Sequence, residues 1–337
     1  MSDLAAVAQA MVAPGKGVLA ADESVATCTK RFTTLGIEST EETRRQYREL
    51  LLTAPGIEEY VSGVILFDET LRQGLTDGTP FAQVLDKSGI FPGIKVDTGA
   101  KPLAGHPGET VTEGLDGLRE RIEEYVALGA KFAKWRAVIT IGDGLPSAAC
   151  LHTNAHALAR YAALCQEGGL VPIVEPEVLM DGDNSIETCD EVTTRTLFAV
   201  FDELVAQDVK LEEMILKPSM VIAGKKAPRQ AGIQEVAEAT VRCLKRTVPA
   251  AVPGVAFLSG GQSAHVATEH LNAMAKLGPL PWGLSFSYGR ALQDPALNAW
   301  LGDPARVPEA QAKLLHRVKV NGVARSGGYS ADMERAA

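Results

Sequence analysis

Charged residues stand at the ends of several short apolar segments of the chain. Lys134 and Arg136 end the segment 131–136, and Glu175 and Glu177 end the segment 171–177. Side chains along a strand point alternately to its two faces, so the two residues of each pair share a face. Each pair can therefore point into one common site.

Lys217 follows the apolar pair Ile215 and Leu216 and precedes Pro218. We expect this lysine to be partly desolvated and to feel repulsion from Lys134. Both effects favour the neutral amine, which is the form that attacks a carbonyl. Neighbouring carboxylates can then supply the acid and base needed to lose water from a carbinolamine.

Two further apolar segments also end in charge, Asp22 on the first and Lys95 with Asp97 on the third. One such residue alone is more often a solvated or ion-paired loop residue. Charges on consecutive strand ends are harder to explain in that way, because a strand interior is a costly place for an ion.

Glycine-rich turns follow the last two apolar segments and predict a phosphate site. Ser259 and Gly260 lie in Ser-Gly-Gly-Gln-Ser, and Gly289 and Arg290 lie in Ser-Tyr-Gly-Arg. Glycines let backbone N–H groups approach an anion, and arginine can bind it through two hydrogen bonds. Ser24 and Arg31, with Lys30, are candidates for a second anion site, although a solvated helix start explains Lys30 and Arg31 equally well.

The elements that position these residues alternate between short apolar runs and longer segments of helical periodicity, which is typical of βα units. Eight βα units favour a single TIM (β/α)8 barrel with an extra N-terminal segment, and no Gly-x-Gly-x-x-Gly follows the first strand to favour a dinucleotide-binding sheet. The apolar runs are 17–22, 63–68, 93–97, 131–136, 171–177, 213–219, 254–261 and 283–289, and the helical segments are 41–54, 81–89, 114–129, 151–169, 189–207, 234–248, 263–277, 290–302 and 308–323.

Composition excludes several classes of protein. With 46% hydrophobic and 22% charged residues in 337, the chain has the composition of a globular protein. Its 33 Lys and Arg against 42 Asp and Glu give a net charge of −9, so we expect neither nucleic acid nor a membrane as partner. Five cysteines without a Cys-x-x-Cys pair indicate reduced thiols and a cytoplasmic location. His152 and His156 have metal-ligand spacing but lack a nearby third ligand in the sequence, so a helix-surface pair is favoured.

Ten segments in the same order resemble the class I, Schiff-base-forming fructose-bisphosphate aldolases. The resemblance covers almost the whole chain, which it implies to be one aldolase-type barrel domain over residues 1–337. The segments include Leu-Ala-Ala-Asp-Glu-Ser (19–24), Phe-Ala-Lys-Trp-Arg (132–136), Val-Pro-Ile-Val-Glu-Pro-Glu (171–177), Leu-Lys-Pro-Ser-Met (216–220) and Phe-Ser-Tyr-Gly-Arg-Ala-Leu (286–292).

The resemblance implies cleavage of fructose 1,6-bisphosphate into dihydroxyacetone phosphate and glyceraldehyde 3-phosphate, without a metal or other cofactor. It makes Lys217 the Schiff-base lysine and Glu175 the main acid and base, with Glu177 beside it. Asp22 and Lys134 would hold the hydroxyl whose deprotonation starts cleavage. The substrate would be bound by Lys95 and Arg136, its C1 phosphate by Ser259, Gly260, Gly289 and Arg290, and its other phosphate by Ser24 and Arg31.

The resemblance also implies a homotetramer and a flexible C-terminal tail, here 324–337. Relatives commonly end in a tyrosine that exchanges a proton with the carbanion, and Tyr329 is a candidate substitute, as are another group or water.

Two rival functions remain. One is a metal-assisted barrel enzyme that abstracts a proton with Lys134 or Lys217, for which the acidic ligands are poorly placed. The other is a barrel that only binds, although this chain retains the lysines and glutamates that catalysis would need.

Overall fold

The computed structural model describes residues 3–336 and forms a closed barrel of eight parallel strands in the order β1-β10-β9-β8-β7-β6-β3-β2. Each predicted apolar run overlaps one strand, so the predicted (β/α)8 barrel is confirmed. Strands β1, β2 and β7 are buried along their whole length, as a parallel sheet covered on both faces requires. The strands are β1 Gly17–Ala21, β2 Val61–Leu66, β3 Phe91–Lys95, β6 Phe132–Ile139, β7 Val171–Val178, β8 Ile215–Leu216, β9 Gly254–Phe257 and β10 Gly283–Tyr288.

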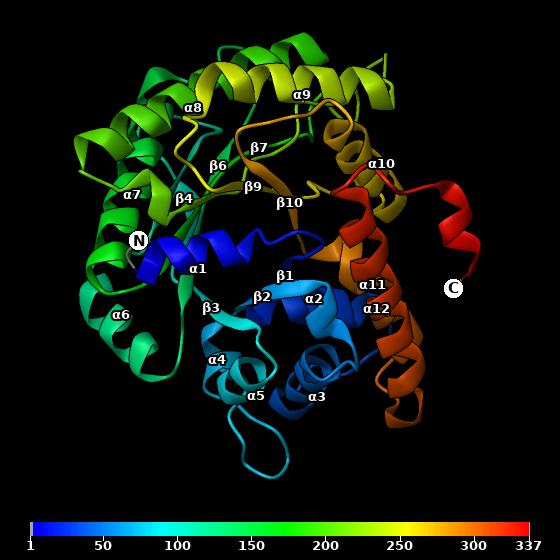
Figure 1. Ribbon diagram of the computed structural model, residues 1–337. Helices are drawn as coiled ribbons and strands as arrows, with labels where there is room; N and C mark the ends of the chain where they lie inside the picture. Colours follow the sequence, from blue (N-terminus) through cyan, green and yellow to red (C-terminus); the bar gives the residue numbers. More distant parts are fainter. Residues whose placement is uncertain (1–2, 337) are drawn as a thin grey trace.

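Helices cover the outside of the barrel (Figure 1). All nine predicted helical segments are confirmed, as α3 and α5 to α12. The α-helices that follow β1 are α2 Val25–Thr34, α3 Glu41–Leu52, α4 Asp68–Leu71, α5 Phe81–Lys87, α6 Leu118–Ala127, α7 Ala148–Glu167, α8 Ile186–Ala206, α9 Ile233–Thr247, α10 Ala264–Ala275, α11 Arg290–Trp300 and α12 Val307–Ala324. Short 3-10 helices are η1 Ile57–Glu59, η2 Leu211–Glu213, η3 Pro304–Arg306 and η4 Ala331–Ala336.

Helix α2 was not among the predicted helices. Its ten residues include four threonines and one valine, which have low helix propensity. It forms because Ser24 caps its first turn by accepting a hydrogen bond from the Thr27 N–H at 3.4 Å, and because Cys28 and Phe32 are buried against the barrel. Arg31 therefore lies in the last turn of a helix.

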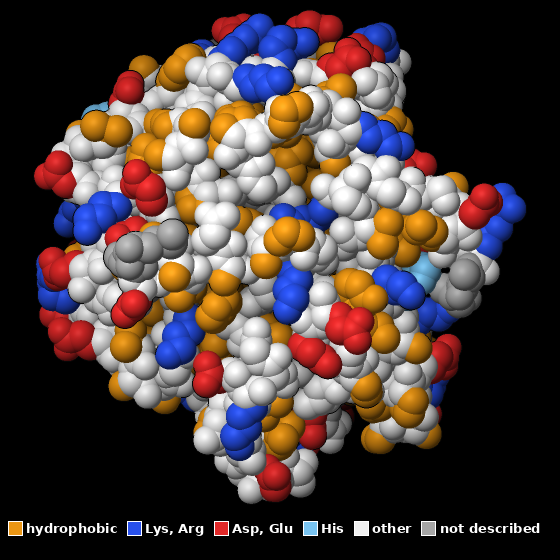
Figure 2. Space-filling model, in the orientation of Figure 1, with side chains coloured by type: hydrophobic (Ala, Val, Ile, Leu, Met, Phe, Trp, Pro, Cys, Tyr) orange, Lys and Arg blue, Asp and Glu red, His pale blue; other side chains and the backbone are white. Residues whose placement is uncertain are grey.

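The N-terminal segment forms helix α1, Asp3–Met11, which lies across one opening of the barrel (Figure 1). Ala8 and Met11 pack into the barrel interior against Val18, Ile65 and other strand residues. This end is where the strands begin, so α1 closes the bottom of the barrel. On the same face, Figure 2 shows side chains of both charges distributed over the surface.

A two-stranded antiparallel hairpin, β4 Gly99–Pro102 and β5 Thr110–Glu113, interrupts the βα alternation after β3. No predicted strand corresponds to this hairpin. Thr112 Oγ1 donates a hydrogen bond of 2.7 Å to the Arg136 carbonyl, and the Thr98 N–H donates one of 2.9 Å to the Glu113 carbonyl. The hairpin thus holds the chain that follows β3 against β6.

The segment after α12 is packed onto the helices of the barrel. The Tyr329 N–H donates to Asn272 Oδ1 at 2.9 Å, and the Tyr329 hydroxyl donates to Glu334 Oε1 at 2.9 Å. Arg317, itself buried, holds both oxygens of Glu334 at 2.6 and 2.8 Å. The expected flexibility of 324–337 stays a prediction, but these contacts give the segment a defined docking place.

Among the helices of residues 3–336, none has the length and hydropathy to cross a lipid bilayer.

His152 and His156 both contact Glu203 of α8, at 3.3 and 2.9 Å. Among residues 3–336, no group of His, Cys, Asp and Glu side chains has the arrangement of a metal site. The interpretation of the two histidines as a helix-surface pair is therefore favoured by the structure as well.

Candidate active site

The carboxyl ends of the strands surround a cavity of about 1040 Å³, which we call the mouth. Active sites of TIM barrels lie at this end. All thirteen residues predicted from the sequence line the mouth, namely Asp22, Ser24, Arg31, Lys95, Lys134, Arg136, Glu175, Glu177, Lys217, Ser259, Gly260, Gly289 and Arg290.

Glu175 lies between the two buried lysines of the mouth. Its Oε1 is 3.2 Å from Lys217 Nζ, and its Oε2 is 3.5 Å from Lys134 Nζ. Lys134, Glu175 and Lys217 are each only 3 to 4% exposed. Within residues 3–336, Glu175 Oε2 has no hydrogen-bond partner of good geometry. This oxygen is therefore available to a substrate hydroxyl.

The barrel register produces this arrangement. Strand β6 pairs with β7 so that Arg136 lies beside Glu175, and with β3 so that Lys134 lies beside Lys95. Lys217 follows β8 and donates its backbone N–H to the Val174 carbonyl on β7 at 2.8 Å. Three neighbouring strands thus fix the backbone positions from which the two lysines and Glu175 project.

Asp22, at the end of β1, forms an ion pair with Lys134, 2.7 Å from Oδ2 to Nζ. This is the shortest of the three contacts that Lys134 makes with carboxylates of the mouth. Burial alone would raise the pKa of Asp22, but the charges of Lys134 and Lys217 outweigh it and lower the pKa to about 2. Burial likewise opposes the charge of Lys134, but the carboxylates of Asp22, Glu175 and Asp97 raise its pKa overall. Asp22 is therefore ionised and Lys134 protonated at neutral pH.

Asp97 belongs to the site although the sequence analysis assigned it no role. Its Oδ1 accepts a hydrogen bond of 2.6 Å from Lys95 Nζ, and its Oδ2 lies 4.0 Å from Lys134 Nζ. Backbone N–H groups of Gly99 and Arg136 also donate to it, at 3.1 and 3.3 Å. The sequence indicates this contact, because Asp97 comes two residues after Lys95 and the two side chains therefore share one face of the extended chain.

Arg136 and Glu177 form an ion pair at the rim of the mouth. Burial opposes the charge of Arg136, but the adjacent Glu177 carboxylate raises its pKa overall. The Arg136 side chain is 41% exposed, whereas that of Glu177 is 11% exposed. Arg136 can therefore reach a polar ligand from the solvent side while Glu177 fixes its direction.

The turns after β9 and β10 lie side by side, because the two strands pair directly. Gly260 and Gly261 have φ of 60° and 82°, a backbone that glycine adopts without strain. Ser259 is buried beside them. A methyl group on Gly289 would lie 3.4 Å from the Ala20 carbonyl, so glycine lets this turn lie close to β1.

Arg31 has carboxylate neighbours that the sequence analysis did not identify. It contacts Glu23 Oε1 at 2.5 Å and Asp294 Oδ1 at 2.7 Å. Glu23 Oε2 in turn lies 2.9 Å from the buried Arg48. An anion beside Ser24 would therefore have to share the Arg31 guanidinium with these carboxylates.

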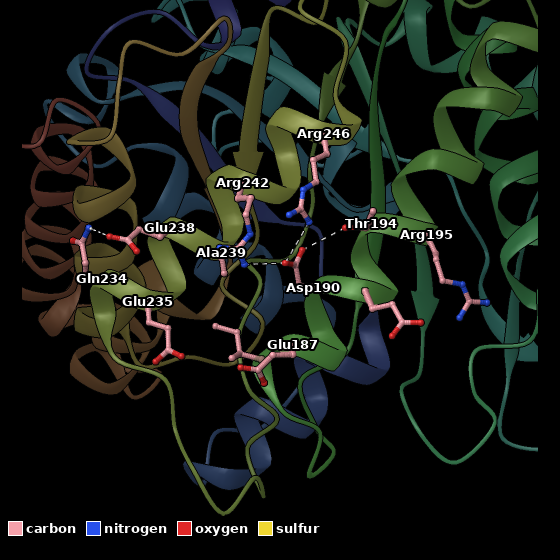
Figure 3. A pocket seen from close by; sticks show the side chains of 12 residues that line it. Glu187, Asp190, Thr194, Arg195, Gln234, Glu235, Glu238, Ala239, Arg242 and Arg246 are labelled. Atoms are coloured by element: carbon pink, nitrogen blue, oxygen red, sulfur yellow. Dashed lines mark hydrogen bonds and ion pairs between the residues drawn. The ribbon is translucent and has the colours of Figure 1, made fainter.

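A second cavity of about 830 Å³ lies outside the barrel between α8 and α9 (Figure 3). In it Asp190 pairs with Arg242 at 3.0 Å and with Arg246 at 3.7 Å. Its lining holds carboxylates and arginines but neither lysine nor histidine. It therefore offers no amine for carbonyl chemistry, and the mouth is the better candidate.

Residues 3–337 match the family model "Fructose-bisphosphate aldolase class-I". The "Probable fructose-bisphosphate aldolase class 1" of Xanthomonas campestris is 62% identical over 98% of this chain and 99% of its own length. "Fructose-bisphosphate aldolase 4, cytosolic" of Arabidopsis thaliana is 52% identical over 95% of this chain and 82% of its own.

A solved structure of fructose-bisphosphate aldolase from Plasmodium falciparum, in complex with TRAP and a small molecule inhibitor, superimposes with a TM-score of 0.96. The two sequences are 48% identical, and the superposition includes 97% of this chain and 95% of the Plasmodium chain. A family model over nearly the full length and relatives above 50% identity agree with the lysine and carboxylates in the mouth. The chain belongs to the class I fructose-bisphosphate aldolase family.

Proposed function

We propose that Lys217 is the nucleophile with which this enzyme carries out the family reaction, the reversible cleavage of fructose 1,6-bisphosphate into dihydroxyacetone phosphate and glyceraldehyde 3-phosphate. The single observation that supports this most is the contact of 3.2 Å between Lys217 Nζ and Glu175 Oε1 in a buried part of the mouth. A lysine amine next to a group that can take and return protons is what imine formation requires.

The first half of the reaction forms the imine. Lys217 first passes its ammonium proton to the Glu175 carboxylate across their contact of 3.2 Å. The neutral amine then adds to the C2 carbonyl of the ketose, and one amine proton moves to the carbonyl oxygen, which gives a carbinolamine. Glu175 then donates a proton to the departing hydroxyl, which leaves as water, and a protonated imine remains on Lys217. Glu175 ends this step as a carboxylate and is ready to act as a base.

The second half breaks the bond between C3 and C4. The C4 hydroxyl donates a hydrogen bond to Glu175 and accepts one from the Lys134 ammonium, which the ionised Asp22 holds in place and which stabilises negative charge as it develops on the oxygen. The hydroxyl proton passes to Glu175, and the electron pair of the broken bond moves into the imine to form an enamine. Glyceraldehyde 3-phosphate leaves, and C3 of the enamine takes up a proton in place of its bond to C4, which restores the imine. Water then hydrolyses the imine and releases dihydroxyacetone phosphate and the free amine.

The remaining mouth residues are assigned to binding. Ser259, Gly260, Gly289 and Arg290 hold the C1 phosphate through a hydroxyl, backbone N–H groups and a guanidinium. Ser24 and Arg31 hold the phosphate at the other end of the sugar, and Lys95 and Arg136 hold the hydroxyls between them. Glu177 is a positioning residue that acts through Arg136.

The test of the nucleophile is Lys217→Met, which removes the amine and keeps the length of the side chain. Cleavage of fructose 1,6-bisphosphate should fall to background, and the exposed Lys210→Met should retain full turnover. If Lys217→Met keeps more than about a tenth of the activity, another group is the nucleophile. Activity should also be the same before and after dialysis against EDTA, because no step uses a metal.

We also propose that the chain forms a homotetramer and that it is located in the cytoplasm. The tetramer rests on family resemblance alone, and light scattering of the purified chain tests it. The cytoplasmic location is supported by the Arabidopsis relative named as cytosolic. Fractionation of the source cells, with the chain detected by an antibody, tests the location.

A further inference from the structure

Lys225 approaches the glycine turn of the C1 phosphate site, although no role has been assigned to it above. A methyl group placed on Gly261 would lie 2.8 Å from Lys225 Nζ and 3.1 Å from Arg290 Nη2. The two cations therefore converge on one point above Gly261. They come from different elements, since Lys225 lies in the loop after β8 whereas Arg290 is the first residue of α11.

The surroundings of that point suit an anion. Within the described chain, neither the Gly260 nor the Gly261 N–H donates to another residue, so both donors remain available. Arg290 forms no ion pair with any carboxylate of residues 3–336. Successive glycines with positive φ form a concave group of N–H donors that binds anions.

The backbone holds Lys225 in place. Its N–H donates to the Met180 carbonyl at 2.7 Å, and the next N–H, that of Lys226, donates to the Gly182 carbonyl at 2.9 Å. These bonds join the loop after β8 to the loop after β7. Lys225 is thus presented by ordered backbone, whereas its long side chain remains able to move.

The only ion pair of Lys225 within residues 3–336 is with Asp181, 2.8 Å from Nζ to Oδ1. Their side chains are 41% and 65% exposed. Such exposed pairs contribute little to stability, so little opposes the exchange of Asp181 for a phosphate dianion.

We propose that Lys225 is a further phosphate-binding residue, which leaves Asp181 and contacts the C1 phosphate of the substrate together with Arg290 and the Gly260–Gly261 turn. This rests on the assignment of that turn to the C1 phosphate. Lys225 makes the enzyme favour ketoses that are phosphorylated at C1 over those that are not.

The experiment compares two ketones that form the same imine, dihydroxyacetone phosphate and dihydroxyacetone. Each is incubated with the whole enzyme and sodium borohydride, and the concentration that gives half-maximal reduced adduct is measured. Lys225→Met should raise this concentration about five- to tenfold for dihydroxyacetone phosphate and leave it unchanged for dihydroxyacetone. Lys225→Arg, which keeps the charge, should restore most of the affinity.

Lys226→Met is the matched control, because it removes the same charge from the next residue, also exposed. It should leave both ketones unaffected. If Lys225→Met does not change the phosphate ketone but Arg290→Met weakens it, the role of Lys225 is wrong and the phosphate turn is right. If neither variant affects it, the assignment of the turn is wrong as well. An equal effect of Lys225→Met and Lys226→Met would mean general charge attraction and would also overturn the proposal.

Discussion

Asp22 Oδ2 lies 2.7 Å from Lys134 Nζ, which joins the end of β1 to β6 across the mouth. Neither residue is a nucleophile in our proposal, but both act on the hydroxyl whose proton is lost. Replacement of Asp22 by Asn keeps the shape and removes the negative charge. We expect Asp22→Asn to lower kcat by about 100-fold or more, as for loss of other groups that assist proton transfer.

The variant should nevertheless form the imine, because Lys217 and Glu175 are intact. Borohydride should therefore still reduce an adduct of dihydroxyacetone phosphate on Lys217. Turnover within twofold of the wild type would contradict the role of Asp22. Loss of both the adduct and turnover in a folded variant would place Asp22 in imine formation instead.

The lowered pKa of Asp22 also predicts how stability depends on pH. Its folded-state pKa of about 2 is below the ordinary value of 3.8. A depressed carboxyl pKa contributes stability that is complete above the unfolded pKa and is lost as the pH falls through the folded pKa. In urea unfolding, the difference between wild type and Asp22→Asn should be constant from pH 6 to about pH 4.5 and shrink towards pH 2. A difference that grows on acidification would contradict this.

Arg290 is expected to act on substrate binding and not on the chemical step. A charge-assisted hydrogen bond contributes about 1.5 to 3 kcal/mol, so Arg290→Met should raise KM about tenfold to a hundredfold and change kcat little. Arg229→Met, on the exposed loop after β8, is the surface control. Steady-state kinetics with fructose 1,6-bisphosphate measures both. An effect on kcat alone would show that Arg290 acts elsewhere.

Glu334 is expected to hold the C-terminal segment, because it accepts hydrogen bonds from the buried Arg317 and from the Tyr329 hydroxyl. Glu334→Gln should destabilise the fold by about 2 kcal/mol, since a buried guanidinium loses its counter-charge. Limited proteolysis should then cut after α12 faster than in the wild type. The neighbouring exposed Arg335→Gln should change neither measurement.

Tyr329 is not among the residues that line the mouth, and its hydroxyl is bound to Glu334. This arrangement argues against Tyr329 as the group that protonates the carbanion. Tyr329→Phe should leave the ratio of cleavage to tritium exchange on dihydroxyacetone phosphate unchanged. A selective loss of exchange would mean that the segment leaves this docking place and that Tyr329 reaches the mouth.

The strands and most helices were predictable because each shows its own periodicity in the sequence. The thirteen mouth residues were predictable for a related reason, since parallel strands in a barrel bring their carboxyl ends together. Helix α2 was not, because a threonine-rich segment becomes helical only through the Ser24 cap and the burial of Phe32. The β4–β5 hairpin is short and largely exposed, so it lacks the buried apolar run that reveals a strand.

Residues that act through partners were harder to find. Glu23 pairs with Arg31 and Arg48 from two helices, and Lys225 and Arg290, which are distant in the sequence, both approach Gly261. Such pairs depend on how helices and loops pack, which no local pattern encodes. The docking of Glu334 on Arg317 is of the same kind.

The central claim is that Lys217 forms the covalent intermediate in the mouth. Its most direct test is to treat the enzyme with dihydroxyacetone phosphate and sodium borohydride and to locate the reduced adduct by mass spectrometry of peptides. We predict one adduct per chain, on Lys217, with loss of activity in proportion to labelling and the same result in EDTA. A label on Lys134 or another lysine, or an unlabelled enzyme whose activity EDTA abolishes, would contradict it.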